Sequence, residues 1–68
     1  MNEDAFNMSL RKFLKKVGIT SQREIEKAVR DAVEAGKVAG DRPLAANMVL
    51  SVPDIGLSVE IDGDLELE

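Results

Sequence analysis

Hydrophobic side chains in the N-terminal half of the chain recur at helical spacing. They form two groups, and residues three or four positions apart within each group share one face of an α-helix. The first group is Phe6, Leu10, Phe13, Leu14 and Val17. The second group is Ile25, Ala28, Val29, Ala32 and Val33. The pattern therefore predicts amphipathic helices in this half of the chain.

Start and stop signals divide this region into two helices. Asn2 is a good residue to cap a helix N-terminus, and Gly18 is typical of the position just after a helix end. The run Ser21-Gln22-Arg23-Glu24 matches a capping box, in which the Ser and Glu side chains bond to each other's backbone amides. Gly36 ends the second group. The sequence thus predicts one helix over about residues 3–17 and another over about residues 21–35.

The C-terminal part of the chain alternates between apolar and other residues, as expected for β-strands. Even-numbered residues of 44–52 and odd-numbered residues of 57–65 are apolar or Gly. A turn at Pro53–Gly56 predicts an antiparallel hairpin in which every residue pair on one face is apolar or Gly. The predicted pairs are Val52 with Leu57, Leu50 with Val59, Met48 with Ile61, Ala46 with Gly63, and Leu44 with Leu65. Slipping this register by one residue would move the whole apolar set to the other face.

An alternative places a tight turn at Asp62-Gly63, followed by a short third strand. That turn would pair Leu65 with Glu60 and break the alternation. One long strand, with a bulge or bend at Gly63, is therefore the preferred interpretation.

These elements predict an α+β fold with the order ααββ, in which both helices pack on one face of the hairpin. The chain of 68 residues is long enough for a single domain, and residues 37–43 are its linker. A two-stranded ribbon is marginal in water by itself, so we expect the helices to cover it. A domain this small has a small core and often gains more by self-association.

The composition removes most catalytic chemistry. The sequence contains no Cys and no His, so disulfides, thiolate metal sites and the commonest general base are missing. Asp62, Asp64 and Glu66 alternate along one strand, which is typical of a solvated strand face. We therefore expect no enzyme activity, no cofactor and no metal. No segment is apolar enough to span a bilayer and the N-terminus does not resemble a secretory signal, so the expected compartment is the cytoplasm.

Charge is divided unequally along the chain, whose net charge is −4. All nine basic residues lie between Arg11 and Arg42, whereas residues 43–68 carry six acids and no base. The outer face of the ribbon also carries an apolar residue, Val49, beside Asn47, Ser58 and Glu60. We predict that these four residues form an interaction surface. The leading functional prediction is a non-catalytic protein-interaction module that binds a protein partner or a second copy of itself.

The alternative prediction is nucleic-acid binding. A short Gly-containing turn between two helices, in the segment Val17–Ile25, resembles a helix-turn-helix. In that interpretation the second helix enters the major groove, and its readers are Gln22, Arg23, Lys27 and Arg30. The acidic net charge and the crowd of acids on the same helix oppose this interpretation, because DNA affinity depends strongly on phosphate neutralisation.

The stretch from Asn7 to Glu26, NMSLRKFLKKVGITSQREIE, resembles a small family of uncharacterised bacterial proteins of about this length. The resemblance extends over nearly the whole chain, including the acidic C-terminal part. It implies a bacterial, non-secreted protein with a domain of unknown function. It implies no activity and no site residues.

Overall fold

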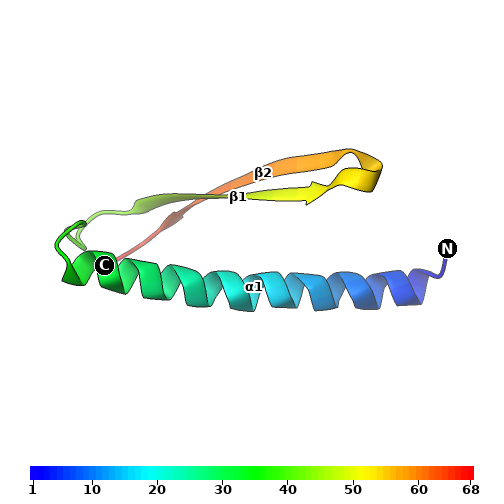
Figure 1. The fold of residues 1–68 in the computed structure, drawn as a ribbon, viewed down its shortest axis with the longest axis horizontal. Helices are drawn as coiled ribbons and strands as arrows, with labels where there is room; N and C mark the ends of the chain where they lie inside the picture. The colour runs from blue at the N-terminus through cyan, green and yellow to red at the C-terminus, as the bar shows by residue number, and fades with distance from the viewer. The chain divides into compact units, whose positions relative to one another are not determined.

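The computed structural model describes residues 1–68, which form two compact units, Met1–Val38 and Ala39–Glu68. The first unit is one helix, α1 (Glu3–Glu34). The second unit contains strand β1 (Leu44–Val52), a short 3₁₀ turn η1 (Pro53–Ile55) and strand β2 (Leu57–Leu65). Figure 1 shows these elements along the chain, and each unit is described by itself below.

Both ends of α1 carry the capping residues that the sequence predicts. The Asn2 side-chain oxygen accepts a hydrogen bond from the Ala5 amide at 3.1 Å, and Glu3 and Asp4 place negative charge at the positive end of the helix dipole. At the other end, Gly36 adopts a φ of 74°. Its amide donates to the Val33 carbonyl, and the Lys37 amide donates to the Ala32 carbonyl. This pair of bonds is a Schellman motif, which ends the helix.

The prediction of two helices, over residues 3–17 and 21–35, is wrong. A single helix of 32 residues runs through Gly18 and Ser21 without interruption (Figure 1). Gly18 does not have a positive φ, and Ser21 lies inside the helix instead of capping a new one. An interior Gly costs about 1 kcal/mol relative to Ala. Breaking the helix would instead create two further ends, each with unpaired backbone groups.

The predicted β-ribbon is confirmed. Strands β1 and β2 are antiparallel, and the pairs Leu44 with Leu65, Met48 with Ile61, and Val52 with Leu57 are those that the alternation requires. Gly56 completes the connection after η1 with a φ of 66°, and its amide donates to the Pro53 carbonyl at 3.0 Å. A left-handed conformation of this kind favours Gly, because Gly has no Cβ that would clash with the backbone.

Strand β2 passes through Gly63 without a turn, a bulge or a third strand. Gly63 pairs with Ala46, and the neighbours Asp62 and Asp64 pair in step with Asn47 and Ala45. The alternative with a tight turn at Asp62-Gly63 is therefore wrong, and so is the bulge. One residue opposes one residue along the whole ladder.

Neither unit has a buried residue. Hydrophobic side chains of α1 and of the ribbon keep a large part of their surface exposed, as Phe13 at 50% and Ile61 at 56% illustrate. Neither unit by itself therefore has a hydrophobic core of the kind that the composition predicts. The covering of the ribbon by helices stays a prediction.

Candidate functional site

The polar face of the ribbon holds the four residues predicted as an interaction surface. Side chains opposite each other on paired strands lie on the same face. The register places Val49 opposite Glu60, Asn47 opposite Asp62, and Ser58 opposite Ser51. Asn47, Val49, Ser58 and Glu60 are all exposed, and Val49 has 61% of its surface exposed. The structure thus brings the four residues together on one face, and their role in binding stays a prediction.

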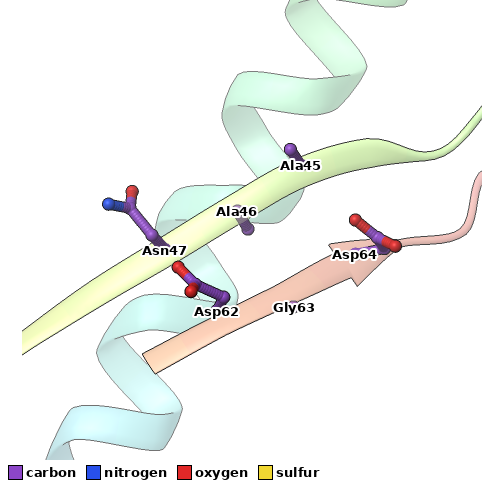
Figure 2. A pocket seen from close by; sticks show the side chains of 6 residues that line it. All are labelled: Ala45, Ala46, Asn47, Asp62, Gly63 and Asp64. Atoms are coloured by element: carbon purple, nitrogen blue, oxygen red, sulfur yellow. The ribbon is translucent and has the colours of Figure 1, made fainter. Parts of the chain in front are cut away.

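An open hollow lies on the ribbon where small residues of both strands meet. It is lined by Ala45, Ala46, Asn47, Asp62, Gly63 and Asp64 (Figure 2). Ala and Gly leave little side-chain volume here. The polar groups at the hollow are one amide and two carboxylates, and Figure 2 shows them projecting from both strands. No set of three His, Cys, Asp or Glu residues is placed to hold a metal ion.

The opposite face of the ribbon is apolar over its whole length. It is made by the even-numbered residues of β1 and the odd-numbered residues of β2, from the pair Leu44–Leu65 to the pair Val52–Leu57. We call it the ribbon stripe. Met48, Val59 and Ile61 of this stripe are exposed, whereas Leu44, Ala46, Leu50 and Leu65 are half-buried. The alternation in the sequence predicts which residues share this face, but it does not show how far each of them is exposed.

The four residues predicted to read nucleic acid lie within α1, well after its start. Gln22 donates from Nε2 to Glu26 Oε1 at 2.8 Å, and Arg30 Nη1 lies 3.9 Å from Glu26 Oε2. The Glu26 carboxylate therefore interacts both with Gln22, one turn before it, and with Arg30, one turn after it. Arg23 and Lys27 are exposed.

The helix-turn-helix interpretation is wrong, because the turn on which it depends does not exist. A recognition helix must be joined to its supporting helix through a turn, so that the two cross at a large angle. Residues 17–25 are instead continuous α-helix. Gln22, Arg23, Lys27 and Arg30 thus have no second helix of this chain to position them in a groove.

The helix also presents an apolar surface that the division into two predicted helices concealed. Phe6, Leu10, Phe13 and Leu14 are each more than two-fifths exposed. Because α1 is unbroken, these residues continue in line with Val17, Ile25 and the alanines of the last turns. The signal that could have revealed this surface is the spacing of four residues from Val17 to Ser21 and again from Ser21 to Ile25, which keeps both groups on one helix face.

Comparison with known protein families gives a match over the whole chain. The model of a family of unknown function (DUF6494) matches residues 1–68. The chain belongs to this family. The resemblance inferred from Asn7–Glu26 to a domain of unknown function is therefore confirmed.

The family is described only as one of unknown function, so membership in it assigns no activity to the chain. No curated protein and no solved structure matches the chain. No helix in it combines the length and the apolar character that crossing a membrane requires. Any functional argument must therefore start from the exposed surfaces of α1 and of the ribbon.

Proposed function

We propose that this chain is a small non-catalytic protein-interaction module that functions by self-association. The observation that carries the proposal is that neither the helical unit nor the ribbon unit buries a residue by itself. Monomeric proteins normally bury their large apolar side chains, and extended apolar surfaces that remain exposed are typical of interfaces.

The two units also need partners for their stability. An isolated helix gains little from its own hydrogen bonds in water, and most helix stability in proteins comes from packing of an apolar face. A two-stranded ribbon is equally marginal without a covered face. Both α1 and the β1–β2 ribbon have such a face.

Covering the exposed apolar side chains would supply free energy for association. Burying a Leu or Phe side chain completely contributes about 1.5–3 kcal/mol. Phe6 and Phe13 are still 47% and 50% exposed, so covering either one would contribute on the order of 1 kcal/mol. Several such side chains are enough to oppose the entropy lost when two copies associate.

The choice of a binding function over catalysis rests on the residues themselves. The sequence has neither His nor Cys. Its carboxylates lie on exposed surfaces, with none buried. A general acid or base needs an environment that tunes its proton affinity, and burial is the usual means.

Sedimentation equilibrium of the purified chain, from low micromolar to millimolar concentration, tests the proposal. We expect a mass above that of the monomer, together with a melting temperature that rises with protein concentration, because association stabilises the folded state by mass action. A monomer with a concentration-independent melting temperature across this range would refute self-association.

A further inference from the structure

One stripe of mainly apolar residues, interrupted by Ser21, runs along the whole of α1. Its residues are spaced 4, 3, 4, 4, 4, 3 and 4 positions apart, which keeps them on one face of a continuous helix. We call this set the helix stripe; it consists of Phe6, Leu10, Phe13, Val17, Ser21, Ile25, Ala28 and Ala32. Phe6, Leu10, Phe13 and Ala28 of this stripe are exposed, and Val17, Ser21, Ile25 and Ala32 are half-buried, so no residue of the helix stripe is completely covered.

The intervals between successive residues of the helix stripe are the same when counted from Phe6 to Ala32 as when counted from Ala32 to Phe6. A second α1, turned end over end about a two-fold axis level with Ile19, therefore brings every stripe residue opposite another stripe residue, while Leu14, beside the stripe, comes level with Glu24 of the partner subunit. The resulting pairs are Phe6 with Ala32, Leu10 with Ala28, Phe13 with Ile25, and Val17 with Ser21. Each pair occurs twice, as an interface with two-fold symmetry requires.

The sizes of the paired side chains favour this antiparallel arrangement. The N-terminal half of the helix stripe carries two Phe and a Leu, and the C-terminal half carries two Ala and a Ser. Antiparallel pairing places large residues against small ones and keeps the packing even along both helices. A parallel pair would place Phe6 against Phe6 and Ala32 against Ala32, which would crowd one end and leave voids at the other.

From these observations we infer that α1 pairs with α1 of a second copy in antiparallel orientation, through the helix stripe and about a two-fold axis near Ile19. This inference rests on the self-association proposed above, and it specifies the surface and the orientation. The ribbon stripe is not needed for the helix pair and stays free to pack elsewhere.

Disulfide trapping can test the orientation cleanly, because the chain has no native Cys. Two variants, Leu10→Cys and Ala28→Cys, one with a size tag, are refolded together as full chains in a glutathione redox buffer. The antiparallel pair brings residue 10 of one copy opposite residue 28 of the other. We expect the mixed disulfide to exceed each homodisulfide by about tenfold or more, because proximity raises the effective thiol concentration.

Met8→Cys is the matched control. Met8 lies two residues from Leu10 on the opposite side of α1, and 73% of its surface is exposed. When Met8→Cys is mixed with Ala28→Cys, the mixed disulfide and the two homodisulfides should form in the proportions expected from random pairing. Enrichment of the Leu10→Cys homodisulfide would indicate a parallel pair, and statistical proportions for Leu10→Cys with Ala28→Cys would indicate that this face is not the interface. Either result would overturn the inference.

Sedimentation of two charged variants separates this inference from the proposed function. Phe13→Asp should weaken self-association by about 30-fold or more, because it places an unpaired charge in the interface. Met8→Asp should change the dissociation constant by less than about threefold, which is within the usual range for surface substitutions. If Phe13→Asp associates as the wild type does, the helix stripe is excluded and self-association stands. If the wild type is a monomer, both proposals fail.

Discussion

Replacing Gly18 with Ala is expected to stabilise α1. Gly18 lies in the interior of the helix, where Gly is about 0.8–1 kcal/mol less favourable than Ala. No atom lies within 4 Å of the position that an added Cβ would occupy, so no steric penalty offsets this gain. The methyl group also restricts the unfolded chain, which acts in the same direction.

The expected gain is therefore about 1 kcal/mol, which corresponds to an increase in melting temperature of about 4–8 °C for a chain of this size. Circular dichroism at 222 nm reports helix unfolding, and heating or urea titration of wild type and Gly18→Ala at equal protein concentration would measure the difference.

Gly56→Ala is the matched control, because its added Cβ also meets no atom within 4 Å. Its φ of 66°, however, is a left-handed conformation that costs a residue with a side chain about 1–2 kcal/mol. The two substitutions should thus have opposite signs. If Gly18→Ala lowered stability as Gly56→Ala does, the helix would have to end at Gly18, and the single-helix description would be refuted.

Three further outcomes follow from the described contacts. Asn2→Ala removes the side-chain acceptor for the Ala5 amide and should lower helix stability by about 1 kcal/mol in urea unfolding; no change would show that the cap is not formed. Gly63→Val should stabilise the ribbon by up to about 1 kcal/mol, since its Cβ meets no atom within 4 Å; a loss of thermal stability would instead support a turn at this position. Glu26→Ala should cost only a few tenths of a kcal/mol, because the interactions of Glu26 with Gln22 and Arg30 are exposed and such helix pairs are weak; a loss above about 1 kcal/mol in the same unfolding assay would contradict this.

The ribbon was predictable residue by residue. Alternation with a period of two determines which residues share a face, and a single register keeps every apolar residue on one face. Leu50 with Val59 and Met48 with Ile61 follow from this pattern alone, and the structure has both pairs. The common face of Asn47, Val49, Ser58 and Glu60 follows in the same way.

The helical half was predicted less well, because its local signals conflict. Gly18 and the run from Ser21 to Glu24 each favour an interruption, whereas the spacing from Val17 through Ser21 to Ile25 favours continuity. The cost of keeping Gly18 inside a continuous helix is only about 1 kcal/mol. A difference this small does not decide from the sequence whether the helix is interrupted or continuous. The mistaken break also produced the helix-turn-helix hypothesis and concealed the helix stripe.

The sequence by itself determined the faces and the register of the ribbon, because they depend on a strict period that any slip destroys. It also determined both ends of α1 through Asn2 and Gly36. Only the tertiary structure decided that α1 is one helix and that neither unit buries a residue by itself. The first property depends on the cost of two further helix ends against a continuous hydrogen-bond ladder. The second depends on how much apolar surface a single helix or a two-stranded ribbon can cover. Neither is a local property of any residue.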